Sequence, residues 1–179
     1  MPGAGQEGGR LVAGLRAFIR PGLHVNLRDV SQPSSPSETG SWASLLSGSK
    51  QVFQNTHFTV LVNERMSLVL TRRGEKPFAS VEELEAVFAD FANALDRLDR
   101  PRYALVADIR AAPGRNDPVF EPVMQRLAPR WFGGFRKVGV LVKNTVGMLQ
   151  SQRYARKDGI SRLTSNDEAE MFRYLTQED

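Results

Sequence analysis

Two nearly continuous apolar runs constrain the fold of this chain more than any other feature. Residues 103–109 (YALVADI) and 138–142 (VGVLV) contain almost no polar side chain that could face water. Such runs are typical of central strands covered on both faces, because half-exposed strands alternate apolar and polar residues. Segments with helical periodicity separate the two runs. Strands that alternate with helices predict an α/β fold with a mostly parallel sheet.

The other elements expected from residue 51 onward fit the same architecture. Residues 52–62 and 66–71 are rich in β-branched and aromatic residues, and they predict an N-terminal antiparallel hairpin. The order predicted for a single domain is therefore β-β-α-β-α-β-α-β-α, with helices packed against the sheet. Helices are expected at 81–98, 117–128 and 145–157 and after Ser165, and a last short strand at 160–163.

Helix starts are indicated by residues that can satisfy unpaired backbone amides. Ser80 with Glu83 has the spacing of a capping box, and so has Ser165 with Glu168. Thr145 is expected to cap the helix that follows it. The segment Trp131–Phe135 (WFGGF) contains two glycines, and we interpret it as the apolar packing of a long connection rather than as an exposed contact surface.

The first 50 residues differ in composition from the rest. They contain eight Gly, four Pro and eight Ser, which predicts a disordered extension before a domain at 51–179. Its one apolar patch, residues 11–19, is interrupted by Arg16, and it is either an amphipathic interaction helix or part of a tail without a specific role. Domain-like patterning begins at Gln51, so a true start at Val52 or a nearby codon is the alternative.

Composition excludes several classes of protein. With no cysteine, the chain has no disulfide and no thiolate ligand, and its two histidines, His24 and His57, cannot form a histidine-rich metal cluster. No apolar run approaches the length of a membrane-spanning helix. The net charge is only +4, with few aromatic residues among the basic ones, so we expect no nucleic-acid partner. A cytoplasmic chain without metal or cofactor is the expectation.

Catalytic arrangements are also missing from the pattern. No serine lies in a GxSxG elbow, and His57 is expected inside the first strand rather than beside a nucleophile. Asp108 ends a predicted strand, but the adjacent Arg110 favours a structural anion over a general base. We therefore expect a protein that is not an enzyme.

The strongest candidate site lies where two strands end. Ligands of open α/β sheets collect beyond the carboxyl ends of the strands, and loops 108–117 and 143–147 should meet there. The first loop carries Arg110 and Arg115 ahead of a helix start, where free amides favour anions. In the functional interpretation these residues bind a phosphate, a carboxylate or an acidic partner. In the structural alternative they pair with nearby carboxylates and only hold the loop rigid.

A second candidate is the helix that begins near Thr145. Gln150, Arg153 and Lys157 recur at spacings of three and four, which places them on one helical face, with Arg156 nearby. Such a face could bind an acidic protein or a phosphate, or it could simply be solvated.

Three passages carry a resemblance to a known family. VFQNTHFTV, DIRAAPGRNDPVFE and VGVLVKNTVGMLQSQR, together with the order of elements, resemble the bacterial STAS-like (SpoIIAA-like) domains over residues 51–179. The resemblance implies a non-catalytic regulatory module that docks a kinase or an anti-sigma factor through the helix after the central strand. In phosphorylated members a serine lies at the start of that helix. Residues 111–117 here contain neither Ser nor Thr, and Thr145 is the nearest hydroxyl.

The resemblance and the residue patterns lead to two functional hypotheses. The first is a regulatory, protein-binding module that docks its partner through residues 110–128. The alternative is a small-ligand sensor or carrier that binds an anionic nucleotide or lipid head group between the loops at 110–117 and 143–147. The residues expected to form the partner or anion site are Arg110, Arg115, Asn116, Asp117, Thr145, Arg153 and Arg156.

Overall fold

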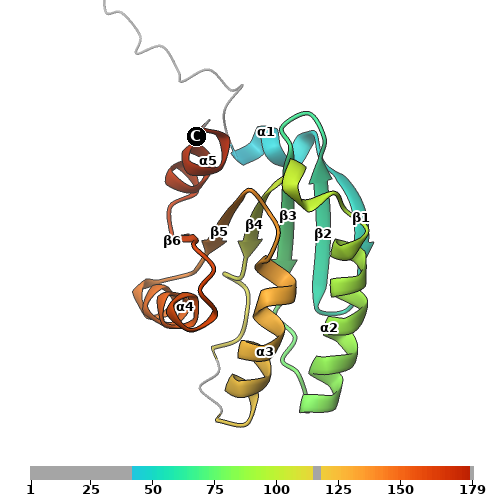
Figure 1. The fold of residues 1–179 in the computed structure, drawn as a ribbon, viewed down its shortest axis with the longest axis vertical. Helices are drawn as coiled ribbons and strands as arrows, with labels where there is room; N and C mark the ends of the chain where they lie inside the picture. The colour runs from blue at the N-terminus through green and yellow to red at the C-terminus, as the bar shows by residue number, and fades with distance from the viewer. Residues whose placement is uncertain (1–41, 115–117, 178–179) are drawn as a thin grey trace, which may run out of the picture. The chain divides into compact units, whose positions relative to one another are not determined.

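The computed structural model describes residues 42–114 and 118–177, and it confirms the predicted α/β class. Six strands form one sheet in the order β1-β2-β3-β4-β5-β6 (Figure 1). The strands are β1 (Lys50–Gln54), β2 (Phe58–Asn63), β3 (Leu68–Arg73), β4 (Ala104–Asp108), β5 (Lys137–Leu141) and β6 (Leu163–Ser165). The helices are α1 (Trp42–Ser47), α2 (Val81–Asp96), α3 (Phe120–Phe132), α4 (Thr145–Asp158) and α5 (Glu168–Thr176), with a 3₁₀ turn, η2, at Arg100–Arg102.

The sheet is mixed, as predicted, but its antiparallel part has three strands instead of two. β1, β2 and β3 pair antiparallel, and β3 through β6 pair parallel. The stretch predicted as one strand at 52–62 is broken by a turn, where Asn55 Oδ1 accepts hydrogen bonds from the amides of His57 (2.9 Å) and Phe58 (2.7 Å). Asparagine is suited to such turns because its side chain bonds to nearby backbone. His57 therefore lies in the turn and not in a strand.

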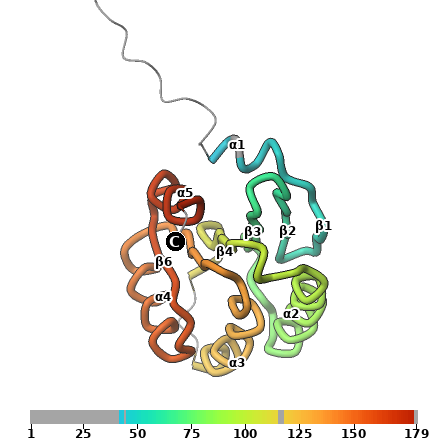
Figure 2. Tube along the Cα trace, turned by 45° about the horizontal axis from the view of Figure 1, so that its top comes forward, coloured from blue at the N-terminus to red at the C-terminus, as the bar shows by residue number. Residues whose placement is uncertain are grey.

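Helices cover both faces of the sheet, and each face has its own core. α2, α3 and α4 follow one another on one face, and α1 and α5 lie on the other; Figure 2 shows the two groups on opposite sides of the strands. Leu45 of α1 is fully buried in the second core. Residues 42–50 were expected to belong to the extension, yet α1 and the first residue of β1 are part of the folded unit. The rest of the predicted extension lies outside the described residues.

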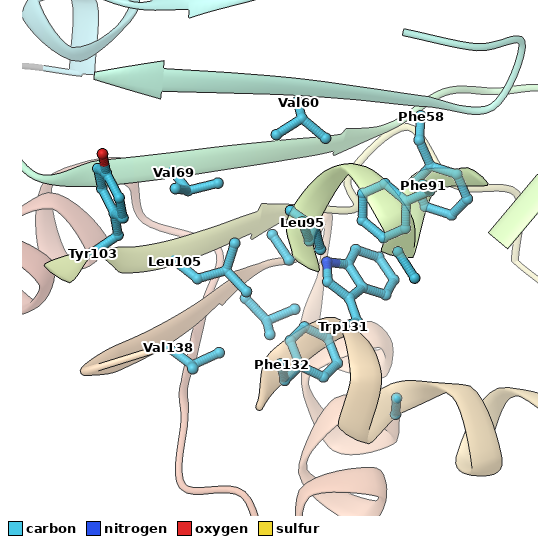
Figure 3. Packing of buried hydrophobic residues seen from close by; sticks show 14 of the residues in the cluster. Phe58, Val60, Val69, Phe91, Leu95, Tyr103, Leu105, Trp131, Phe132 and Val138 are labelled. Atoms are coloured by element: carbon cyan, nitrogen blue, oxygen red, sulfur yellow. The ribbon is translucent and has the colours of Figure 1, made fainter. Parts of the chain in front are cut away.

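The larger core is built around an aromatic cluster. Phe58, Phe91 and Trp131 meet with ring centroids 4.3 to 5.5 Å apart, from β2, α2 and α3 (Figure 3). The Trp131 indole donates a hydrogen bond to Thr71 Oγ1 on β3 (3.1 Å). Trp131 and Phe132 are buried, as predicted, but they end α3 instead of forming a connection. This cluster fixes α2 and α3 on the sheet.

α3 differs most from its predicted bounds. It begins at Phe120, and the expected caps, Asn116 and Asp117, lie outside the described residues. Pro129 was expected to limit the helix, but the helix continues to Phe132 because burial of the Trp131 and Phe132 rings compensates for one missing backbone hydrogen bond.

The capping residues were predicted correctly at one helix and wrongly at two. Ser80 caps α2, with its Oγ accepting from the Glu83 amide (3.2 Å). α4 is capped by Asn144 rather than Thr145, and α5 by Asp167 rather than Ser165. Ser165 ends β6. Asp and Asn cap helices at least as well as Ser and Thr. A neighbouring Asp or Asn therefore caps the helix where the chain that leaves the strand gives that residue the required backbone geometry.

Candidate functional site

The carboxyl ends of the parallel strands open into one cavity of about 880 Å³. The two predicted loops, 108–117 and 143–147, both contribute to its wall, the first through residues 109–114 of its described part. Its floor is formed by Val140 and Val142, and α3 and α4 form its sides. Apolar and aromatic wall residues include Phe58, Phe78, Ile109, Met124, Trp131, Phe132, Val146 and Tyr154.

Arg110, the first of the predicted site residues, is held by carboxylates. Its Nε and Nη2 donate to the two oxygens of Asp108, both at 2.8 Å, and Nη1 donates to Glu168 Oε1 at 2.5 Å. The hydrogen bonds to Asp108, followed by the contact with Glu168, raise the pKa of Arg110 above its ordinary value. These pairs match the structural alternative, in which Arg110 fixes the loop after β4.

The neighbouring candidates Arg115, Asn116 and Asp117 lie outside the described residues. Their part in the site therefore stays a prediction.

On α4 the predicted basic face is turned partly toward α3. Arg153 Nη2 lies 2.9 Å from Glu121 Oε2, and Lys157 Nζ lies 3.4 Å from the other oxygen of the same carboxylate. Arg153 and Lys157 therefore link two helices across the cavity side. Arg156 is exposed, and Thr145 is the exposed first residue of α4.

Arg73 is a wall residue that the sequence analysis missed. Its side chain comes from the end of β3, is 6% exposed, and makes no ion pair with any carboxylate in the described part of the chain. The guanidinium lies 4.3 Å from the Phe78 ring and donates to the carbonyls of Gly74 (2.7 Å) and Lys76 (2.5 Å). Burial lowers the pKa of Arg73 to about 10. The sequence signal that could have identified Arg73 is its position in the strand. Val69, Thr71 and Arg73 are two residues apart in sequence, so their side chains lie on the same face of the sheet.

A second buried arginine, Arg162, lies at the α4 end of the cavity. Its Nη2 pairs with Asp158, and its guanidinium stacks 4.4 Å from the Phe132 ring. Its Nε is buried and has no hydrogen-bond partner. Arginine stacked on aromatic rings therefore occurs at two places in the cavity wall.

The mouth of the cavity has one further cation and an apolar rim. Lys143, next to Val142, is exposed and forms no ion pair within residues 42–114 and 118–177. Val119, Val146 and Leu149, at the starts of α3 and α4, are each more than half exposed. Val146 lines the cavity, whereas Leu149 does not.

His57 is buried beside this region without facing the cavity. Its Nδ1 lies 2.8 Å from Thr56 Oγ1, its Nε2 lies 3.4 Å from the Pro77 carbonyl, and its ring stacks on Phe78 at 4.5 Å. Burial lowers the pKa of His57 below its ordinary value of 6.5, so the ring is neutral at pH 7. Its contacts are those of a residue that holds the segment before α2.

Comparisons with family models, curated protein sequences and solved structures find no match to this chain. The resemblance to STAS-like domains is therefore a prediction that these comparisons leave open. In the described ranges, no three histidine or carboxylate side chains are grouped as a metal ion would need. Nor does any helix there have the length and apolar character needed to cross a bilayer.

Proposed function

We propose that this chain is a cytoplasmic, non-enzymatic module that binds a small amphipathic anion, with a carboxylate or phosphate head and an apolar body. The observation that carries the proposal is the cavity of about 880 Å³ at the carboxyl edge of the sheet, with apolar walls and a buried arginine, Arg73, that forms no ion pair with a carboxylate of the described residues. It is a modified form of the second hypothesis drawn from the sequence, which expected an anionic nucleotide or lipid head group between the loops at 110–117 and 143–147.

The size and lining of the cavity support a ligand with an apolar body. Pockets for small molecules usually have volumes of about 300–1,000 Å³ and mostly apolar walls with a few fixed polar groups. Val140 of β5, Val142 just after it and the rings of α3 supply such walls. A ligand lying over them would remove apolar surface from water at about 25 cal/mol for each Å².

The charges of the wall support an anionic head group. A buried cation is costly unless it is paired. Hydrogen bonds to carbonyl oxygens compensate for the burial of the Arg73 charge, but carbonyl oxygens are weaker partners than a carboxylate or a phosphate. Lys143 at the mouth adds a second cation that is not neutralised by a described carboxylate. Phosphates and carboxylates therefore fit this site better than neutral ligands.

Binding of anilinonaphthalene sulfonate, an anion with an aromatic body, tests the proposal. Val146→Trp narrows the mouth, and Leu149→Trp is its matched control, because both residues are exposed on α4 and only Val146 lines the cavity. Lys143→Gln removes the cation at the mouth, with the exposed Arg156→Gln as its control. We expect Val146→Trp to weaken binding and Lys143→Gln to weaken it about fivefold, the equivalent of about 1 kcal/mol. Fluorescence titration measures all four variants, and equal affinities throughout would refute the proposal.

A second candidate function is docking of a protein partner, as the resemblance to STAS-like domains implies. Val146 and Leu149, two exposed apolar side chains three residues apart on α4, favour it together with the exposed Val119 at the start of α3, because apolar side chains on a surface can serve as contacts for a partner. The same pair of variants separates the two functions. A protein that covers the rim would be displaced by Leu149→Trp as well as by Val146→Trp, whereas a small ligand inside the cavity would respond to Val146→Trp alone.

A further inference from the structure

Arg110 connects the cavity to the opposite face of the sheet. Arg110 is one of the residues that line the cavity, together with residues of α3 and α4. Its guanidinium also reaches Glu168, in the first turn of α5, and lies 6.0 Å from the Trp42 ring of α1. Both of these helices pack on the other face (Figure 2). No other cavity residue in the described ranges forms an ion pair with α5.

The two carboxylates hold Arg110 with unequal strength. Asp108 is nearly buried at the end of β4, and it receives two parallel hydrogen bonds of 2.8 Å from the guanidinium. Such paired geometry is the most stable form of an arginine–carboxylate contact. Glu168 receives one hydrogen bond, and its side chain is 39% exposed. The contact with Glu168 is therefore the one that a competing anion can replace.

The helices on the far side are short enough to respond to a lost contact. α5 has nine residues and α1 has six, and helices of this length depend on tertiary contacts for their stability. α1 is anchored by Leu45 and by the Asn63 side chain, whose Nδ2 donates to the Leu45 carbonyl at 3.0 Å. The first turn of α5 is tied to the sheet edge by Glu168 and, through Ser165, by Glu170.

We propose that an anion bound in the cavity replaces Glu168 as the partner of Arg110, and that this exchange loosens α1 and the first turn of α5 on the opposite face. Arg110 stays attached to Asp108 and acts as a positioning residue between the two sites. Binding of a ligand in the cavity thereby changes a surface that the ligand does not contact. This inference rests on the proposed function, because it requires that the cavity binds an anion.

Thermodynamic linkage makes the idea testable without a variant in the cavity wall. If ligand binding weakens the contact between Arg110 and Glu168, then weakening that contact must strengthen ligand binding by the same factor. Glu168→Gln does this without altering a residue of the cavity wall. Glu85→Gln is the matched control, because Glu85 is also a half-exposed helix carboxylate paired with an arginine, Arg126, and its pair joins α2 to α3.

Anilinonaphthalene sulfonate serves as the probe in the full-length chain. We expect Glu168→Gln to bind it at least about fivefold more tightly than the wild type, while Glu85→Gln leaves the affinity unchanged. Hydrogen exchange, followed by mass spectrometry, should quicken in peptides covering α1 and α5 when the probe binds the wild type, and should show no such response in Glu168→Gln.

The outcomes distinguish this inference from the function on which it rests. Loss of binding in Val146→Trp but not in Leu149→Trp, together with equal affinities of the wild type and Glu168→Gln, would retain the cavity and overturn the role of Arg110. An exchange response in α5 that persists in Glu168→Gln would overturn it as well. If the probe does not bind the wild type at all, the proposed function fails and the inference fails with it.

Discussion

At the scale of single residues, two buried polar side chains explain how one wall of the cavity is held in place. Arg73 and His57 are both buried, and both use backbone carbonyls of the segment before α2 as partners. Phe78 packs between them, stacked on His57 and lying under the Arg73 guanidinium. Two side chains that are normally exposed thus fix one wall of the cavity, and any change in their charge acts on that wall.

His57 gives the stability of the protein a dependence on pH. Burial lowers its pKa below 6.5 in the folded state, so the unfolded chain takes up a proton more readily. The free energy of unfolding therefore falls as the pH drops below about 6.5. We expect His57→Gln to remove this part of the pH dependence, because glutamine can keep one hydrogen bond but does not titrate. Urea unfolding at pH 7.5 and pH 5.5 measures it, and an identical loss of stability in both proteins would contradict the assignment.

At the scale of elements, the sequence correctly predicted the helices and strands whose positions depend on apolar periodicity and on the conformational preferences of their residues. The buried strands β4 and β5, and helix α2 with its cap at Ser80, follow from apolar spacing and capping chemistry. Asn55 was not recognised as a turn former, because residues 52–62 as a whole are rich in β-branched and aromatic residues. The bounds of α3 depend on burial of Trp131 and Phe132, a tertiary effect that overrides Pro129.

The sequence predicted where the candidate site lies better than it predicted which residues form it. Topology alone indicates that the loops after β4 and β5 meet at one edge, and both line the cavity. Of the two arginines predicted in the first loop, Arg115 lies outside the described residues and Arg110 is paired with Asp108 and Glu168. Arg73, which was not predicted, forms no ion pair with a described carboxylate. The difference depends on which carboxylate lies near which guanidinium in three dimensions, and a single sequence does not contain that information.

Capping of α2 contributes a measurable part of the stability. Ser80 accepts from the Glu83 amide, and the Glu83 carboxylate accepts from the Ala79 amide at 2.6 Å. We expect Ser80→Ala to lower the free energy of unfolding by about 1 kcal/mol, because an amide of the first turn loses its partner. Urea unfolding measures the change, with the exposed Ser161→Ala as control. Equal losses in the two variants would show that the cap does not carry the effect.

At the scale of the whole molecule, the two faces of the sheet differ in the size of their cores and in whether they hold the candidate site. The face with α2 and α3 holds the aromatic cluster and the cavity beside it, so it combines the larger core with the candidate site. The face with α1 and α5 has a smaller core, in which short helices cover β3, β4 and β5. Among the described residues, Arg110 is the one cavity residue that forms an ion pair with a helix of the second face.

The position of α1 determines where the folded unit begins, and it leads to a last prediction. A chain that starts at Trp42 keeps Leu45 in the second core, whereas one that starts at Gln51, the boundary expected from composition, loses it. Removing residues 42–50 takes Leu45 out of the core that also contains Leu68 and Leu70, and it leaves Asn63 Nδ2 without its acceptor, the Leu45 carbonyl. We expect the shorter chain to be less stable by about 3 to 5 kcal/mol, from a buried leucine and an unpaired amide together. Denaturant unfolding of the two chains measures the difference, and equal stabilities would place the boundary at residue 51 after all.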